Sequence, residues 1–317
     1  MQDKLTDKKN QSKALLTVGI VANLSAIFYF KYADFVLSLI QGVSFNCALV
    51  QEKIPLGISF FTFTQIAYLI DAYYKKTSPA NFSKYALFVT YFPHLIAGPL
   101  LHHKEMIDQF HWSKKDEERS HNFATGWTLL AFGLFKKVFL ADKLGLIADQ
   151  YFTQIPLISM DLVSAWTAAI SYSLQLYLDF SGYSDMAIGI SLFFGVRLPI
   201  NFHSPYKATS IIDFWRRWHM SLSNFLRDYL YFPLGGSRKG FPRKLLNLLI
   251  VMFFCGIWHG AGITFVVWGL YHGVLLVINH TLRHIKSTLT DNPILQVLKL
   301  IITFYLVILG WVIFRSP

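Results

Sequence analysis

The stretch Phe253-Phe254-Cys255-Gly256-Ile257-Trp258-His259-Gly260-Ala261-Gly262 places a histidine inside an apolar run that continues to Trp268. An ionisable side chain at membrane depth is costly and usually faces a polar cavity or a substrate path. A membrane-spanning helix needs about 20 predominantly apolar residues, and the run around this stretch has that length. The stretch therefore predicts a transmembrane helix that carries His259 to an internal site.

The composition of the whole chain agrees with this prediction. Of the 317 residues, 54% are hydrophobic and 15% are charged, and the mean hydropathy is +0.41. A soluble domain of ordinary composition has about 25% charged residues. The apolar segments are continuous rather than alternating, which excludes a transmembrane β-barrel. The predicted fold class is all-α, a polytopic transmembrane helical bundle.

Eight apolar runs are candidate spans, at residues 14–30, 54–74, 85–101, 122–140, 162–180, 245–258, 263–278 and 295–314. Residues 35–50 and 186–194 are too short to span alone. Residues 179–231 mix glycine and proline with aromatic and charged side chains. Irregular backbone at membrane depth is tolerated only where protein buries it or it lines a cavity. We expect this segment to be irregular and to form the wall of an internal site.

The net charge of +11 does not indicate a nucleic-acid partner, because the basic residues gather at the ends of apolar runs. The clearest case is the loop at residues 235–244, which holds Arg238, Lys239, Arg243 and Lys244 and no acidic residue. Loops with such an excess of basic residues lie in the cytoplasm. The glycines and the proline of this loop predict turns.

A second histidine lies in the cluster Asp213-Phe214-Trp215-Arg216-Arg217-Trp218-His219-Met220-Ser221. Helical spacing would place Trp215 with Trp218, and Arg216 with His219, on common faces. Two interpretations stay open. The cluster is either an interfacial helix whose arginines reach lipid headgroups, or a reentrant helix that holds a phosphate-bearing donor near His219.

His259 also has two interpretations, a structural histidine bonded to a neighbouring helix or a general base. The flanking Gly256, Gly260 and Gly262 permit close approach of another chain or a ligand, which favours the second. Cys255 lies four residues earlier and would share a helix face with His259. A Cys–His nucleophilic pair is conceivable, but a small buried residue is the preferred interpretation.

Asp179 and Asp185 belong to a polar group that follows an apolar run. Helix capping and turn formation explain such residues. Alternatively, one carboxylate orients a histidine or pairs with Arg216 or Arg217, and support of the site is the preferred role. No metal site is predicted, because His280 and His284 lack an adjacent glutamate and the neighbours His102 and His103 point apart.

Several longer motifs resemble those of the membrane-bound O-acyltransferase superfamily. They are Leu178-Asp179-Phe180-Ser181-Gly182-Tyr183-Ser184-Asp185, the His219 cluster, and residues 91–99, 227–236 and 256–261. The segment at residues 231–240 resembles the alginate O-acetylation branch. The D-alanyl-lipoteichoic-acid branch is similar around Trp218-His219 and Trp258-His259.

The resemblance implies an acyltransferase with a tunnel through the membrane, in which His259 matches the catalytic histidine and His219 the second site position. Donor-binding or supporting roles are expected for Trp218, Arg216, Arg217, Asp179, Asp185 and Trp258. Either arginine could hold donor phosphates by bidentate contacts. The expected donor is acetyl-CoA or another acyl thioester, used as a substrate, and no resident cofactor is expected.

The resemblance also implies the setting of the reaction. We expect a multi-pass protein of the bacterial cytoplasmic (inner) membrane, in contact with membrane lipid and acting toward an extracytoplasmic polysaccharide acceptor such as alginate. The expected partners are an extracytoplasmic acetyltransferase and the polysaccharide synthesis machinery. D-alanyl transfer to teichoic acid and a non-enzymatic transporter are the alternatives. Residues 1–317 are expected to form a single domain, incomplete at both ends relative to the family.

Overall fold

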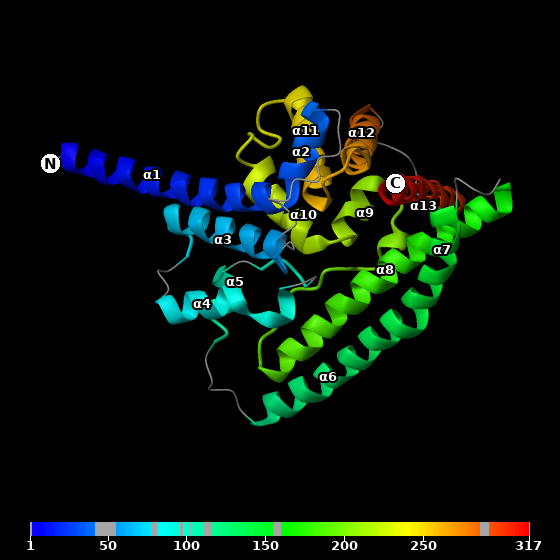
Figure 1. Cartoon of the computed structure of the whole chain (residues 1–317), viewed down its shortest axis with the longest axis horizontal. Helices are drawn as coiled ribbons and strands as arrows, with labels where there is room; N and C mark the ends of the chain where they lie inside the picture. Colours follow the sequence, from blue (N-terminus) through cyan, green and yellow to red (C-terminus); the bar gives the residue numbers. More distant parts are fainter. Residues whose placement is uncertain are drawn as a thin grey trace. The chain divides into compact units, whose positions relative to one another are not determined.

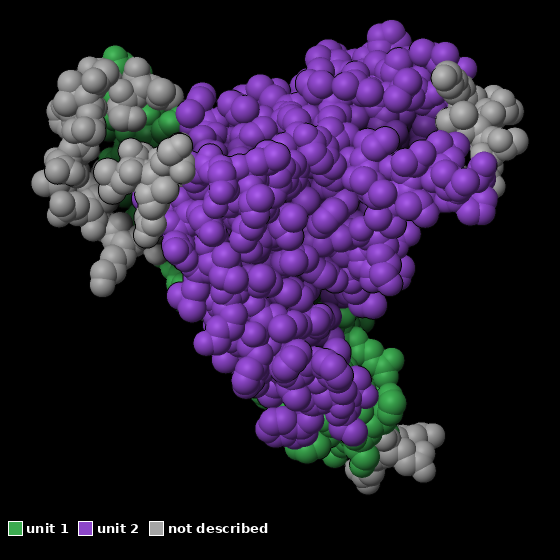
Figure 2. Space-filling model, turned by 90° about the vertical axis from the view of Figure 1, so that its right-hand side faces the viewer, with its two compact units in different colours: residues 1–123, 191–198 green, residues 124–190, 199–317 purple. Residues whose placement is uncertain are grey.

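A computed structural model describes residues 2–41, 55–77, 81–95, 98–101, 103–110, 116–154, 160–285 and 292–316. Within these ranges every regular element is a helix and there is no strand, which confirms the all-α prediction (Figure 1). The chain groups into two compact units, coloured separately in Figure 2. Unit 1 comprises Met1–Phe123 with Ser191–Leu198, and unit 2 comprises Ala124–Ile190 with Pro199–Pro317. Each is described by itself.

Unit 1 begins with a long helix. α1 (Gln2–Ile27) passes through a π-helical turn, η1 (Phe28–Tyr32), into α2 (Ala33–Gln41). α3 (Ile58–Tyr73) packs beside α1 (Figure 1), where Gly19 leaves room for the side chain of Leu69. The unit continues with α4 (Phe82–Thr90), the 3₁₀ turn η2 (Phe92–His94), α5 (His103–Ile107) and the start of α6 (Asp116–Leu134).

The expected span at residues 85–101 is not a single helix. α4 ends at Thr90, and a 3₁₀ turn containing Pro93 follows. The residue before a proline is pushed away from helical geometry, so a helix usually ends there or earlier. The expected interfacial segment at residues 35–50 is described only as far as Gln41, within α2, and its remainder lies outside the described residues.

The first half of unit 2 contains the rest of α6, the π-helical turn η3 (Phe135–Ala141), α7 (Asp142–Gln154) and α8 (Leu162–Phe193) up to Ile190. The last residues of α8 belong to unit 1. α8 has 32 residues, which corresponds to about 48 Å at 1.5 Å per residue. The prediction of irregular backbone from residue 179, and of a separate short segment at 186–194, is therefore wrong up to Phe193. Gly182 and Gly189 let this helix approach α6 closely, because a Cβ at either position would strike the backbone carbonyl of Gly133 or Gly126.

The second half of unit 2 starts with short elements, as predicted for an irregular wall. These are η4 (Pro205–Lys207), α9 (Ile211–Arg217), α10 (Met220–Leu226) and the π-helical turn η5 (Arg227–Tyr231). Three long helices follow, α11 (Phe241–His259), α12 (Ile263–Ile285) and α13 (Pro293–Arg315). α9 contacts α12 and α13, so the irregular segment packs against the long helices.

Four helices in the described part of the chain are long and apolar enough to cross a membrane. They are Asn10–Leu37, Phe241–His259, Ile263–Ile285 and Pro293–Arg315. They coincide with the predicted spans at residues 14–30, 245–258, 263–278 and 295–314, and their length and composition are those of a membrane protein. The expected spans at 122–140 and 162–180 are helical but are not among these four, and α3, at 16 residues, is too short to qualify.

Candidate active site

His219 occupies a break between two helices rather than a helix face. α9 ends at Arg217, Trp218 is extended, and His219 adopts the left-handed region with φ 44°. The prediction that Arg216 and His219 share a helical face is therefore wrong. A non-glycine residue in this conformation is strained, and such strain gathers at functional sites. The His219 side chain is buried, 1% exposed, and its ring lies edge-on to Phe180 at 4.7 Å.

Asn201 holds the His219 ring. Its Oδ1 accepts hydrogen bonds from the Ser221 backbone N–H at 3.2 Å and from the Ser221 hydroxyl at 2.9 Å. Because a backbone N–H only donates, these bonds fix which amide atom is the oxygen. His219 Nδ1, 3.2 Å from the same oxygen, must therefore carry the proton and donate it. In the neutral ring Nε2 then offers a lone pair, and it has no hydrogen-bond partner among the described residues.

His259 is the last residue of α11 and is half-buried. Its ring contacts Trp258, Trp268 and Phe314, with centroids 4.8, 5.0 and 5.3 Å away. Trp258 also contacts the ring of His219 at 6.2 Å. The two histidines are close enough to interact electrostatically. Two histidines 40 positions apart in sequence thus meet around one tryptophan.

Tryptophans and a further histidine form the packing behind this pair. Trp218 is buried and lies 4.8 Å from Trp311, ring to ring. His272 of α12 is fully buried between Trp215 and Trp268, at 5.3 and 5.1 Å. Neither nitrogen of His272 has a hydrogen-bond partner in the described part of the chain. The sequence did not point to His272, because this histidine has no polar motif around it in the apolar segment that forms α12.

The glycines near His259 serve the packing of α11 on α12. A Cβ at Gly256 would strike the carbonyl oxygen of Phe265, and a Cβ at Gly260 would strike the Phe265 ring. The close approach predicted for these glycines is therefore made by a helix of the same chain rather than by a ligand. Cys255 is a free, fully buried thiol, in agreement with the preferred structural interpretation.

The two arginines of the cluster have different surroundings. Arg217 Nε donates to Asp213 Oδ1 at 3.0 Å, and its Nη1 reaches the His203 carbonyl at 3.4 Å. Arg216 instead lines a cavity of about 440 Å³. Arg216 is therefore the arginine placed to meet a ligand, and Arg217 braces the chain beside the break at His219.

The cavity beside Arg216 combines cationic and apolar walls. Arg227, Lys244 and His280 also line it, and its described lining includes no carboxylate. The apolar wall comes from Ile212, Leu226, Leu248, Val251, Met252 and Leu276. Arg227 is paired in bidentate fashion with Asp228, at 2.7 and 3.0 Å, so Arg216 and Lys244 supply most of the positive charge. The cavity could hold a phosphate group attached to an apolar arm.

Sequence reasoning missed Arg227, Lys244 and His280 as members of one cavity. The i,i+4 spacing of His280 and His284 beside Arg283, at the end of an apolar run, predicts a solvated interfacial face for both. His284 is exposed, but His280 is half-buried in the cavity wall, so the prediction is wrong for His280. The basic loop predicted at 235–244 forms turns only as far as Gly240, with positive φ at Gly235, Gly236 and Gly240. The prediction is wrong from Phe241 onward, because α11 begins there and Pro242 lies in its first turn. Asn247 Nδ2 fixes the loop by donating to the Gly236 carbonyl at 2.9 Å.

Asp179 and Asp185 lie within α8 and cap no helix, so the capping interpretation is wrong. Asp185 pairs with Lys136 at 2.5 Å, and Asp179 pairs with Lys137 at 2.7 Å. Both lysines belong to η3. The described partners of the two carboxylates are therefore these lysines, and not Arg216, Arg217 or a histidine. The two ion pairs tether α8 to η3.

The described residues contain no cluster of three or more metal-ligating side chains. His103 Nδ1 is 2.7 Å from the Thr77 hydroxyl, and burial lowers the pKa of its imidazole, against the opposing effect of Asp108 and Asp71. His102 and Cys47 lie outside the described residues.

Comparison with known proteins identifies the family. The membrane-bound O-acyltransferase family matches residues 49–314. A peptidoglycan O-acetyltransferase of Helicobacter pylori is 43% identical over 95% of this chain and 62% of its own length. A probable alginate O-acetylase, AlgI, of Pseudomonas aeruginosa is 45% identical over 95% of this chain and 57% of its own length. A teichoic acid D-alanyltransferase of Bacillus subtilis is 29% identical over 82% of this chain and 68% of its own length.

The greater similarity to the O-acetylases confirms the predicted branch. The chain spans about three fifths of the length of those relatives. The match to the family covers most of the chain, including the segments that carry His219 and His259. The chain belongs to the membrane-bound O-acyltransferase family.

Proposed function

We propose that this chain forms the acyl-transfer core of a membrane-bound O-acyltransferase of the bacterial cytoplasmic membrane. It moves an acyl group, namely acetyl, from a cytoplasmic thioester toward an extracytoplasmic polysaccharide. The observation that supports this most is the meeting of His219 and His259 around Trp258 in a chain related to O-acetylases.

In the proposed reaction His259 is the general base. Its imidazole takes the proton of the acceptor hydroxyl as the hydroxyl oxygen attacks the thioester carbonyl. The tetrahedral intermediate then expels the thiolate, which takes up the proton. An ester forms and a thioester breaks, with no oxidant or reductant. His219 Nε2 has a lone pair and no hydrogen-bond partner among the described residues, so it can position a reactant by accepting a hydrogen bond from it.

The cavity beside Arg216 is the proposed donor site. A thioester such as acetyl-CoA carries phosphates at one end of an apolar arm, which matches Arg216 and Lys244 beside apolar walls. Met220, which follows His219 directly, also lines the cavity. Lys244 belongs to the basic segment predicted to face the cytoplasm, so the phosphates would enter from that side.

The acceptor is an exported polysaccharide, with alginate or peptidoglycan as the chemical class named for the relatives. A separate extracytoplasmic acetyltransferase and the polysaccharide synthesis machinery are the proposed partners. D-alanyl transfer to teichoic acid is the second candidate, because a relative at 29% identity carries that name.

The test uses the purified chain in lipid vesicles with labelled acetyl-CoA. Thioester consumption is expected for the wild type and for His121→Ala, an exposed histidine of α6 that serves as the control. It should be lost in His259→Ala. Thioester use that persists without His259 would refute the assignment, and flux of acetyl-CoA without cleavage would indicate a transporter instead. Preference for a D-alanyl thioester would favour the second candidate.

A further inference from the structure

Unit 1 contains a cavity that is separate from the residues discussed above. It has a volume of about 680 Å³, within the range of roughly 300–1,000 Å³ that small-molecule sites occupy. It is formed by α4 and the residue after it, the turn that follows α5, the first turns of α6, and the end of α8 with the turn that follows it, all within this unit. Its lining is Leu87, Tyr91, Gln109, Phe110, Arg119, Ser120, Asn122, Phe123 and residues 192–196.

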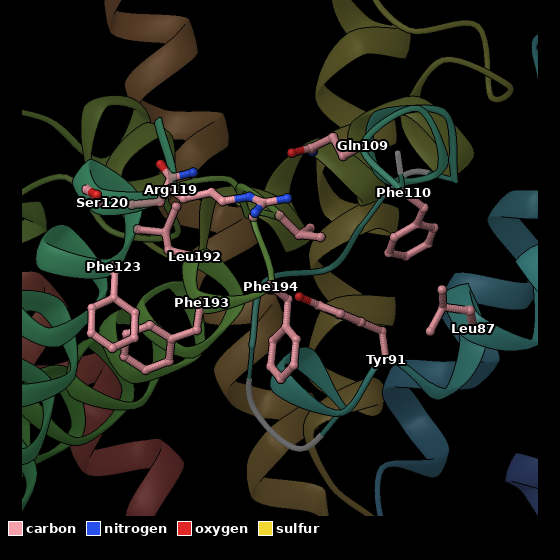
Figure 3. A pocket seen from close by; sticks show the side chains of 13 residues that line it. Leu87, Tyr91, Gln109, Phe110, Arg119, Ser120, Phe123, Leu192, Phe193 and Phe194 are labelled. Carbon is pink, nitrogen blue, oxygen red and sulfur yellow. The ribbon is translucent and has the colours of Figure 1, made fainter. Parts of the chain in front are cut away.

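The cavity has a polar side and an apolar side. Figure 3 shows Gln109, Arg119 and Ser120 along one side and the rings of Phe123, Phe193 and Phe194 along the other. Arg119 is the one charged side chain in the described lining, and its guanidinium extends over the hollow (Figure 3). Such a division suits a ligand with an anionic head and an apolar chain.

A buried amide adds a second, independent sign of a ligand. Asn122 is 3% exposed and lines the cavity, yet its Nδ2 has no hydrogen-bond partner among the described residues. A buried donor left without an acceptor loses its hydrogen bonds to water without replacement and is destabilising. An oxygen-rich ligand group in the cavity would supply that acceptor.

The walls are held in place without a ligand. The Tyr91 hydroxyl and the Ser191 hydroxyl lie 2.7 Å apart, which ties the end of α4 to the end of α8. Gln109 exchanges two hydrogen bonds with the backbone of Arg197, at 2.8 and 3.1 Å. Both contacts keep the hollow open, as in preformed binding sites.

We propose that this cavity binds an anionic phospholipid. Its phosphate is held by Arg119, its ester oxygens accept hydrogen bonds from Asn122, and one acyl chain lies along the phenylalanine rings. A guanidinium suits phosphate because it makes two parallel hydrogen bonds. Phe123 and Phe194 are each 54% exposed, so the chain would enter from the bilayer beside them.

The experiment measures lipid binding to the delipidated full chain by native mass spectrometry. The probes are dioleoylphosphatidylglycerol, dioleoylphosphatidylcholine and sn-glycerol 3-phosphate. The anionic lipid should bind most tightly, and Arg119→Gln should weaken it about tenfold, as expected for loss of one charge-assisted contact. Lys143→Gln removes an exposed cation of α7 and should have no effect.

A second variant guards against misfolding. Ser120→Trp adds bulk at an exposed position in the cavity lining and removes no described contact, and it should weaken binding of both lipids while far-ultraviolet circular dichroism stays unchanged. Equal binding of the two lipids, or wild-type binding by Arg119→Gln and Ser120→Trp, would overturn the proposal. Glycerol phosphate binding as tightly as the lipid would assign the site to a free phosphate and overturn it as well.

Discussion

The side-chain oxygen of Asn201 accepts a hydrogen bond from His219 Nδ1 at 3.2 Å while it also accepts the backbone N–H of Ser221. The second bond fixes the amide, and the fixed amide sets the tautomer of the imidazole. Asn201 is therefore proposed as a positioning residue, which acts through His219 rather than on the substrate.

Replacing Asn201 tests this role. Asn201→Leu should lower kcat by about tenfold to a hundredfold, the usual effect of losing an orienting hydrogen bond at a buried group. Asn201→Asp keeps the accepting oxygen and should recover part of the rate. Because a carboxylate raises the pKa of a neighbouring imidazole, the acid limb of its pH profile should shift to higher pH. A purely structural role predicts no shift in the profile.

Arg216 and Arg217 should separate donor binding from stability. Arg216→Gln should raise the KM for the thioester donor about tenfold with little change in kcat, since one charge-assisted contact is lost. Arg217→Gln removes a half-buried ion pair with Asp213 and should cost about 0.5–1 kcal/mol of unfolding free energy while the donor KM stays the same. Steady-state kinetics measure the donor KM, and thermal unfolding measures the stability of each variant. A larger increase in donor KM for Arg217→Gln than for Arg216→Gln would contradict the proposed donor site.

Gly256 should be intolerant of any side chain. A Cβ there meets the Phe265 carbonyl and the backbone of Gly269, so Gly256→Ala should force α11 and α12 apart at a cost of about 1–3 kcal/mol. The matched control is Gly262→Ala, whose Cβ would come no closer than 3.4 Å to the Phe265 ring. Equal unfolding temperatures for the two variants in detergent would show that the glycine contact is not needed.

The Lys136–Asp185 pair should behave as a coupled unit. Each side chain is about a quarter exposed, so Lys136→Met, which leaves a carboxylate without its partner, should cost about 1–2 kcal/mol. The double variant Lys136→Met/Asp185→Leu should recover most of that loss. Additive losses in the double-mutant cycle would mean that the pair contributes no coupling.

The topology can be mapped with cysteines at Ser237 and Lys239, in the basic loop before α11. They should react with impermeant thiol reagents only after the cytoplasmic face is opened, because the basic residues of this loop predict that side. The wild-type chain controls for its own two cysteines, Cys47 and Cys255. Labelling of intact cells from outside would reverse the topology and remove a cytoplasmic donor.

The sequence was most informative where its signal is local. Length and hydropathy predicted α11, α12 and α13, because a spanning helix is recognised from its own residues. His219 and His259 were found because a histidine is conspicuous in an apolar stretch. The helix through Asp179 and Asp185 was missed, since the lysines that pair with them lie more than forty positions earlier in the chain.

The rest of the site depends on contacts that no local pattern encodes. In the sequence, Asn201 resembles an ordinary turn residue. It lies beside the imidazole of His219 only because the helix is interrupted between α9 and α10. The cavity beside Arg216 takes residues from α9, η5, α11 and α12, and their convergence is a property of packing. The sequence points to Asn201 only indirectly, as a polar residue within the 179–231 segment that was predicted to line an internal site.

Transfer of an acyl group across the membrane by His259 is tested most directly with inverted membrane vesicles. Labelled acetyl-CoA is supplied outside, on the original cytoplasmic face, and base-labile acyl esters are measured on polysaccharide within the lumen. Vesicles that contain the wild-type chain or His121→Ala should accumulate labelled ester in the lumen, and His259→Ala vesicles should accumulate none. Luminal ester formed at the wild-type rate by His259→Ala, in a variant shown to be inserted, would contradict the account.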